Sequence, residues 1–213
     1  KTAHLIPQSG KDPIPVTYGE LRTQVHGVAS ALVGLGVQRG DRVVLQAESS
    51  ADWAMCDWAC QTLGAVLVPI YPTLPADQSQ YIVQDCGARL VVASAKTLGQ
   101  LEQSQEARPL PCWTVDEATP QAASLPAALQ ALPAGQVSFA DRPMGRDLLY
   151  SSGTTGRPKG VLKPLWPAEL RGQTDPEALG TARIMGMGED TVYLSPAPLY
   201  HAAPLRYTLR VLE

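Results

Sequence analysis

The sequence predicts an α/β fold, with layered and mostly parallel sheets covered by flanking helices. Three observations predict it. Short apolar runs alternate along the chain with segments of helical periodicity. Glycines lie at the ends of many of these segments. The segment 52–63 is apolar nearly all round, which is typical of a helix buried between layers.

A capping box between Thr17 and Glu20 predicts the start of the first helix. Apolar residues at helical spacing follow it, and Gly36 is expected to end the helix. A turn then leads into a strand over 42–47. The spacing of these signals places the first helix and the first core strand within the first fifty residues.

The buried helix over 52–63 is broken by a glycine, and a strongly apolar strand over 65–71 follows it. Pro75 suits the first turn of a third helix, which Gly87 is expected to stop. Residues 90–94 are predicted to form another strand. Strand and helix therefore alternate through the first part of the chain.

The segment 95–145 is rich in Ala, Gln and Pro and is interpreted as connecting structure, with short helices around 97–106 and 122–131. Residues 147–162 read as a strand, a loop and a second strand. An irregular stretch is expected over 163–190.

The end of the sequence is expected to contain a strand over 191–194 and a helix over 202–211. Two prolines between these elements favour an extended path out of the strand. Ligand sites in open α/β sheets lie at the carboxyl ends of strands, so residues that leave this strand are candidates for substrate contact.

Composition excludes several classes of function. A net charge of −3 gives no general attraction to nucleic acid or anionic lipid, and no apolar run approaches the roughly 18 residues of a transmembrane helix. The four cysteines contain no C-x-x-C pair, and the three histidines do not cluster with them in sequence, so no metal site is expected. A reduced, cytoplasmic protein fits this cysteine usage.

The segment 150–160, Tyr-Ser-Ser-Gly-Thr-Thr-Gly-Arg-Pro-Lys-Gly, carries most of the functional information. Glycines let backbone N–H groups approach an anion, hydroxyls add uncharged donors, and a lysine supplies a mobile charge for a terminal phosphate. The candidate phosphate-binding residues are Ser151, Ser152, Gly153, Thr154, Thr155, Gly156 and Lys159. Further basic residues lie near this loop in sequence and either suit ATP or belong to an ordinary charged surface: Arg142, Arg146, Arg157 and Lys163.

This loop is not the common nucleoside-triphosphate pattern G-x-x-x-x-G-K-[ST]. Pro158 precedes Lys159 where that motif has glycine, and Gly160 follows where it has a Mg²⁺-binding hydroxyl. A flexible Ser/Gly linker is also a poor interpretation, because strand-like residues flank the loop on both sides. A polyphosphate loop of another kind is therefore favoured.

The segment resembles the phosphate-binding signature of the AMP-forming acyl ligases, which include acyl-CoA synthetases, peptide-synthetase adenylation domains and firefly luciferase. Every position matches the usual form of that motif. The stretch Pro196-Ala-Pro-Leu-Tyr-His201 resembles the Pro-Leu-aromatic-His stretch of acyl-CoA synthetases. Adenylation domains carry Phe-Asp-x-Ser there instead, which argues against an amino-acid substrate. Residues 17–21, 35–45, 64–72 and 81–89 also resemble the N-terminal core of the family.

The resemblance implies that 1–213 is an incomplete N-terminal domain, with a first α/β region at 1–94, a connecting segment at 95–145 and the phosphate-loop and acyl-site region at 146–213. The C-terminal domain would be absent. The implied reaction joins a carboxylate to ATP, releases pyrophosphate, and passes the acyl group to coenzyme A, with Mg²⁺ on the phosphates.

The roles of residues also follow from the resemblance. Lys159 and His201 are the expected catalytic residues, with His201 beside the carboxylate and Lys159 near the γ-phosphate. The family's Mg²⁺-binding acidic residue has no counterpart to which it can be assigned in this sequence. The expected substrates are long-chain fatty acids or bulky cyclic acids, and the chain alone is expected to be inactive. Peripheral membrane contact and a homodimer stay open.

Two other interpretations compete with this one. A nucleotide-binding or interaction module without catalysis would share the loop and lack the rest of the machinery. A hydrolase that uses Ser151 or Ser152 as nucleophile and His201 as base is disfavoured, because the G-x-S-x-G pattern is absent.

Overall fold

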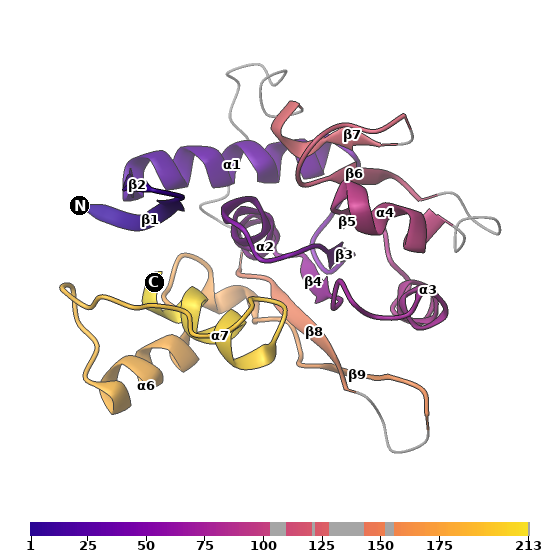
Figure 1. Cartoon of the computed structure of the whole chain (residues 1–213). Coiled ribbons are helices and arrows are strands. Elements are labelled where there is room, and N and C mark those ends of the chain that lie inside the picture. Colours follow the sequence, from indigo (N-terminus) through magenta and orange to yellow (C-terminus); the bar gives the residue numbers. More distant parts are fainter. Residues whose placement is uncertain (103–109, 121, 128–142, 152–155, 213) are drawn as a thin grey trace.

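The computed structural model describes residues 1–102, 110–120, 122–127, 143–151 and 156–212. Within these ranges the chain forms a seven-stranded sheet of order β7-β6-β5-β3-β4-β8-β9 (Figure 1). Its strands are β3 (Arg42–Gln46), β4 (Val66–Pro69), β5 (Leu90–Ala93), β6 (Cys112–Thr114), β7 (Ala123–Ser124), β8 (Arg146–Ser151) and β9 (Lys159–Leu162). All neighbouring strands are parallel except β8 and β9, which pair antiparallel. The predicted mostly parallel α/β fold is confirmed.

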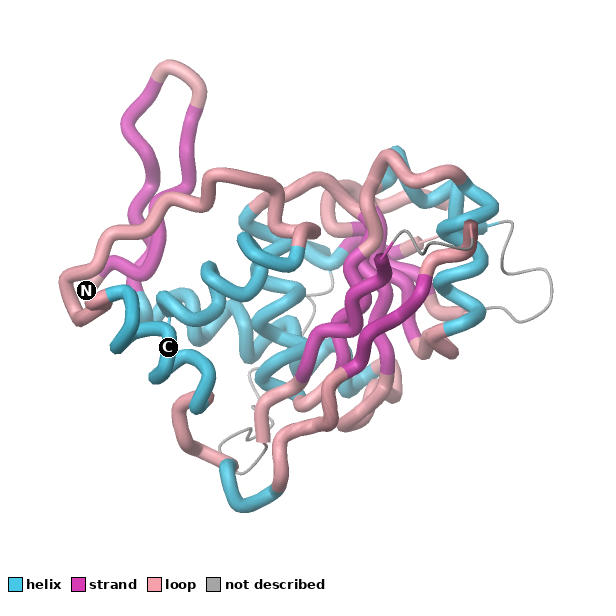
Figure 2. Tube along the Cα trace, turned by 90° about the horizontal axis from the view of Figure 1, so that it is seen from below, coloured by secondary structure: helices cyan, strands magenta, loops and turns pink. Residues whose placement is uncertain are grey.

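Helices cover both faces of this sheet (Figure 2). The helices of the chain include α1 (Tyr18–Gly34), α2 (Ala51–Leu63), α3 (Ala76–Asp85), α4 (Ala95–Glu102), α6 (Pro176–Met185) and α7 (Ala202–Leu212), with a short 3-10 helix, η2 (Ala168–Leu170). The helices α1 and α2 pack with one core cluster and α3 and α4 with the other. Alternate residues of β3 divide accordingly, since Val43 and Leu45 join the first cluster and Val44 joins the second.

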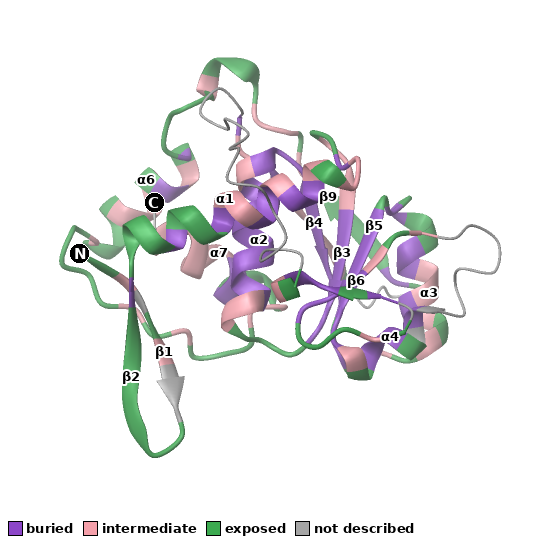
Figure 3. Ribbon diagram, turned by 90° about the horizontal axis from the view of Figure 1, so that it is seen from above, coloured by how far each residue is buried: buried purple, intermediate pink, exposed green. Residues whose placement is uncertain are grey.

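The first two helices form where the sequence predicts them. Glu20 N–H donates to the Thr17 hydroxyl at 3.2 Å, and Thr17 N–H donates to the Glu20 carboxylate at 2.8 Å, which completes the capping box. In α2 nearly every residue is buried, and Gly64 ends the helix in the left-handed region at φ 78°. Figure 3 shows this helix and the central strands as the most buried part of the molecule.

A close backbone contact sets the entry to β8. Gly145 N–H donates to the Gln61 carbonyl at 2.8 Å, and Arg146 N–H donates to the Ala65 carbonyl at 3.1 Å. A Cβ atom on Gly145 would lie 2.1 Å from the Ala65 oxygen. Only glycine therefore fits between the α2–β4 turn and the first residue of β8.

Several elements differ from the sequence expectations. An antiparallel hairpin, β1 (Thr2–Gln8) and β2 (Lys11–Thr17), precedes α1 and was not anticipated. The segment 95–145 contributes β6 and β7 to the sheet. The helix expected over 122–131 is wrong at residues 123–124, which form β7, and part of that range lies outside the described residues. The helix expected over 97–106 corresponds to α4, and residues 103–106 of the expected range lie outside the described residues.

Two expectations near the end of the chain are wrong. The stretch 163–190 contains α6, which Asp175 caps by accepting from Glu177 N–H at 2.7 Å and which Gly186 ends. The strand expected over 191–194 has no regular structure, because no strand in the described part of the chain pairs with it. Val192 and Leu194 are 96% and 86% exposed there. The helix expected over 202–211 is confirmed as α7.

Candidate functional site

The candidate site lies at the carboxyl ends of the parallel strands β3, β4 and β8, which are neighbours in the sheet. Ser49 follows β3, Tyr71 follows β4, and Ser151 ends β8. The stretch 196–201 returns to this edge, because Leu199 N–H donates to the Ser49 hydroxyl at 2.7 Å. Segments about 150 residues apart in sequence thus meet at one edge of the sheet.

Three aromatic rings gather there, those of Tyr71, Tyr200 and His201. The centroid of the His201 ring lies 4.8 Å from that of Tyr71 and 5.0 Å from that of Tyr200, and the two tyrosine rings lie 5.4 Å apart. The Tyr71 carbonyl accepts a hydrogen bond of 3.1 Å from the side chain of Gln46, a buried residue at the end of β3. This bond ties the backbone under the ring cluster to the core.

Sequence reasoning selected His201 but missed Tyr71 and Ser49. The available signal was the position of each residue near the end of a predicted strand, since Tyr71 is the last residue of the strand predicted over 65–71 and Ser49 follows the strand predicted over 42–47. That signal was insufficient, because which strands are neighbours depends on the sheet order, and the sequence does not specify it.

The strands β8 and β9 form the stem of the predicted phosphate loop. Ser151 is the register partner of Lys159, and its hydroxyl donates to the Lys159 carbonyl at 3.4 Å. Gly156 adopts φ 86°, a left-handed conformation that glycine reaches without strain. The side chains of Ser151, Arg157 and Lys159 are exposed. Four predicted phosphate-binding residues lie outside the described residues: Ser152, Gly153, Thr154 and Thr155.

The stem is held against α3 by the hydroxyl of Tyr150. Tyr150 donates to one carboxylate oxygen of Asp85 at 2.5 Å, and Tyr81 donates to the other at 3.1 Å. The guanidinium of Arg157 lies 5.5 Å from the centre of the Tyr81 ring. Asp85 is a further residue that sequence reasoning missed.

Two basic residues expected near the phosphates are engaged elsewhere. Lys163 contacts the Glu177 carboxylate at 2.8 and 3.0 Å, and Arg146 lies 3.7 Å from it. Arg210 of α7 donates to the same carboxylate at 2.8 Å, and these cations hold the pKa of Glu177 below its usual range, with the Lys163 hydrogen bond the largest cause.

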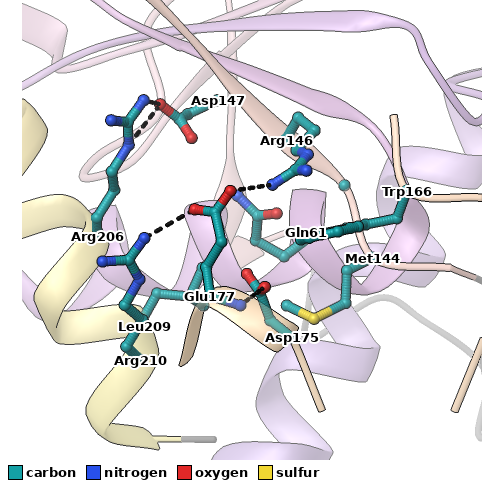
Figure 4. Close-up of a pocket in the computed structure, with 11 residues that line it drawn as sticks. Gln61, Met144, Arg146, Asp147, Trp166, Asp175, Glu177, Arg206, Leu209 and Arg210 are labelled. Carbon is teal, nitrogen blue, oxygen red and sulfur yellow. Dashed lines mark hydrogen bonds and ion pairs between the residues drawn. The ribbon is translucent and has the colours of Figure 1, made fainter. Parts of the chain in front are cut away.

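Figure 4 shows Glu177 with Arg146 and Arg210 beside a cavity of about 20 Å³. A second ion pair, between Arg206 and Asp147 at 2.7 Å, joins α7 to β8 beside it. The cavity lies at the amino end of β8, whereas the phosphate loop follows the carboxyl end. We interpret the cluster as the structural junction that fastens α6 and α7 to the sheet.

Comparison with known proteins decides the family. The sequence profile described as AMP-binding enzyme matches residues 3–212. The chain belongs to the AMP-binding enzyme family. Within the AMP-binding enzymes, long-chain-fatty-acid–CoA ligase FadD15 of Mycobacterium bovis is 36% identical over 161 residues, which are 68% of this chain and 26% of that protein. A 4-hydroxybenzoate–CoA/benzoate–CoA ligase of Rhodopseudomonas palustris is 32% identical over 195 residues, 88% of this chain and 34% of that protein.

Solved structures share the fold. ATP-bound MatB from Rhodopseudomonas palustris superposes with a TM-score of 0.74 at 23% identity, over 99% of this chain and 41% of that one. The inhibitor-bound N-terminal domain of FACL13 from Mycobacterium tuberculosis gives 0.69 at 26% identity, over 93% of this chain and 48% of that one. The chain thus spans about a quarter to a half of the length of these AMP-binding relatives.

Two features are absent from the described residues. None of the described helices is both long and apolar enough to cross a membrane. Within the same part of the chain, no group of three or more His, Cys, Asp or Glu side chains is placed to hold a metal ion.

Proposed function

We propose that the chain is the phosphate-loop part of an adenylate-forming acyl-CoA ligase, which activates a carboxylate with ATP and passes the acyl group to coenzyme A. One observation carries the proposal. The β8–β9 stem and the His201 ring cluster meet at the same edge of the sheet, in a chain of the AMP-binding enzyme family. The CoA-ligase names of the curated relatives support the reaction class.

The chemistry requires positioning and charge neutralisation more than covalent catalysis. A carboxylate oxygen attacks the α-phosphorus of ATP and pyrophosphate leaves. The coenzyme A thiol then attacks the acyl carbon of the acyl-adenylate, which forms the thioester and releases AMP. Negative charge grows on the departing pyrophosphate, so donors fixed around it lower the barrier.

Within this scheme the loop residues contact the β- and γ-phosphates: Ser151, Ser152, Gly153, Thr154, Thr155 and Gly156. Lys159 supplies charge near the γ-phosphate, and its exposed side chain at the start of β9 is free to extend toward the loop. His201, with its ring held against Tyr71, faces the carboxylate.

Mg²⁺ would neutralise phosphate charge when bound. The left-handed Gly156 and the exposed hydroxyl of Ser151 fit a loop that wraps phosphate oxygens. We assign no protein ligand to the metal. The residues that hold it are proposed to lie in parts of the ligase beyond this chain.

The proposed substrates are long-chain fatty acids or bulky cyclic acids. Relatives named for fatty-acid and benzoate substrates support an apolar carboxylic acid over an amino acid. The ligase is proposed to act in the cytoplasm, where thiols such as those of Cys56 and Cys86 stay reduced. The chain alone is proposed to be inactive and to bind ATP weakly.

The test is a screen of carboxylic acids with ATP and coenzyme A, using the longer ligase that we propose contains this chain. We expect AMP, pyrophosphate and an acyl-CoA to form only when a suitable apolar acid is present. Formation of ADP and phosphate instead, or no acid-dependent product with any chain length or aryl acid, would contradict the proposal. Robust acid-dependent ATP–pyrophosphate exchange by residues 1–213 alone would contradict the proposed inactivity.

A further inference from the structure

The hairpin that carries the phosphate loop projects from the body of the sheet (Figure 1). The strand β8 pairs with β4 only through its first two residues, Arg146 and Asp147. Its remaining residues pair with β9, whose own side chains are exposed, Val161 by 61% and Leu162 by 51%. The part of the hairpin nearest the loop therefore needs another support if the loop is to hold a fixed position.

That support comes from α3. The Asp85 carboxylate at the end of α3 accepts two hydrogen bonds, at 2.5 Å from the hydroxyl of Tyr150 and at 3.1 Å from that of Tyr81. Tyr150 directly precedes Ser151, where the loop begins. A single carboxylate thus ties one strand of the stem to the helix that covers this face of the sheet.

The same tyrosine also touches the second strand of the stem. Gly160 is the register partner of Tyr150, and a Cβ atom on Gly160 would lie 3.0 Å from Cζ of that ring. The ring therefore covers the glycine next to Lys159. Fixing the Tyr150 ring through its hydroxyl fixes both ends of the loop at once.

A cation completes the arrangement. Arg157, within the loop, lies 5.5 Å from the Tyr81 ring centre, the range of a cation–π contact. Burial and then the Asp85 hydrogen bond raise the pKa of Tyr150 above its ordinary value, so this hydroxyl stays a donor at neutral pH.

We propose that Asp85 is a positioning residue for the phosphate loop, acting through Tyr150 on both strands of the β8–β9 stem. The proposal rests on the proposed function, because it assigns the loop to ATP. We call the hydrogen bond between Asp85 and Tyr150 the clamp. The proposal predicts weaker use of ATP and unchanged use of the acid when the clamp is lost. The reason is that the clamp lies on the loop stem, whereas the His201 ring cluster is held separately through Ser49 and Gln46.

The first experiment tests the clamp by a measurement that does not depend on enzyme activity. Hydrogen–deuterium exchange of the β8 and β9 amides is compared in the chain, in Asp85→Ala and in Tyr150→Phe, which keeps the ring over Gly160 and removes only the hydroxyl. Both variants are expected to exchange at least about fivefold faster in the stem, with the core strand β3 unchanged. Tyr18→Phe, an exposed tyrosine on α1, is the matched control and should exchange like the wild type.

The second experiment tests the consequence in the longer ligase. In acid-dependent ATP–pyrophosphate exchange, Asp85→Ala and Tyr150→Phe should raise the KM for ATP about three- to tenfold and leave the KM for the acid unchanged. Asp85→Glu, which keeps a carboxylate, should recover part of the loss. A variant that merely folded poorly would lower kcat by its active fraction and leave both KM values alone.

Three results would overturn the proposal. Unchanged stem exchange in both variants would show that the clamp does not restrain the hairpin. Wild-type activity with an unchanged KM for ATP in Asp85→Ala would refute the positioning role and leave the proposed function standing. No acid-dependent exchange by the wild type would refute the proposed function itself, and with it the role assigned to Asp85.

Discussion

Replacing Gly145 by alanine should cost the protein a large part of its stability. The added Cβ would meet the Ala65 carbonyl oxygen at 2.1 Å and the Cys60 carbonyl oxygen at 2.9 Å. Carbon–oxygen contacts normally stay beyond about 3.3 Å, so the backbone must separate by about 1.2 Å. The two hydrogen bonds across this contact, at 2.8 and 3.1 Å, would then stretch beyond hydrogen-bonding distance.

The size of the effect follows from these terms. Loss of two backbone hydrogen bonds contributes about 1–3 kcal/mol, and overpacking contributes about 1–3 kcal/mol more. The expected total of about 2–6 kcal/mol is a large share of the roughly 5–15 kcal/mol that holds a domain folded. In urea, with a slope of about 2 kcal/mol per molar, the unfolding midpoint should fall by about 1–3 M.

A matched glycine provides the control. Gly99 lies within α4, and a Cβ there meets nothing within 4 Å. Gly99→Ala should therefore stabilise the protein by about 0.5–1 kcal/mol, because alanine loses less backbone entropy in a helix. If the free energy of unfolding of Gly145→Ala lies within about 1 kcal/mol of the wild-type value, the claim of a close backbone contact at the entry to β8 is wrong.

Three further predictions concern stability. Burial raises the pKa of Asp57 to about 7, from an ordinary 3.8. Between these pH values the folded chain keeps a proton on Asp57 that the unfolded chain loses. The free energy of unfolding should therefore fall from about pH 4 to pH 7, by up to about 1.4 kcal/mol per pH unit. Asp57→Asn should flatten this dependence on pH, measured by urea titrations. Glu177→Gln should lower the free energy of unfolding by about 1–2 kcal/mol, because Arg146, Lys163 and Arg210 lose a half-buried anionic partner. The loss should be smaller at high salt, and a loss that does not depend on salt would contradict this prediction. Ser50→Ala should cost about 1 kcal/mol by removing the cap of α2, and an unchanged thermal midpoint would refute that role.

Local signals predicted the elements whose stabilising residues are close in sequence. The capping box at Thr17 predicted the start of α1, and the apolar surface of the segment 52–63 predicted α2. The helix α6 was missed although Asp175, Pro176 and Gly186 marked its ends, because only Ala178 in it is buried and no apolar stripe identified it.

The candidate site was predictable only in part for a different reason. Ser151, Lys159 and His201 stand in local motifs, so the sequence selected them directly. Their neighbours Tyr71 and Asp85 come from elements adjacent to β8 only in the folded sheet. The expected strand at 191–194 fails for a related reason, since an apolar pattern forms a strand only beside a hydrogen-bonding partner.

The most direct test of the account compares two lysines that lie four residues apart. Lys159 starts β9 at the loop, whereas Lys163 pairs with Glu177 away from it. In the longer ligase, Lys159→Ala should slow acid-dependent ATP–pyrophosphate exchange by about 100-fold or more, the cost of losing one transition-state donor. Lys163→Ala should stay within about twofold, because its loss weakens one partly exposed ion pair. Equal rates for Lys159→Ala and the wild type would contradict the claim that this loop receives the phosphates of ATP.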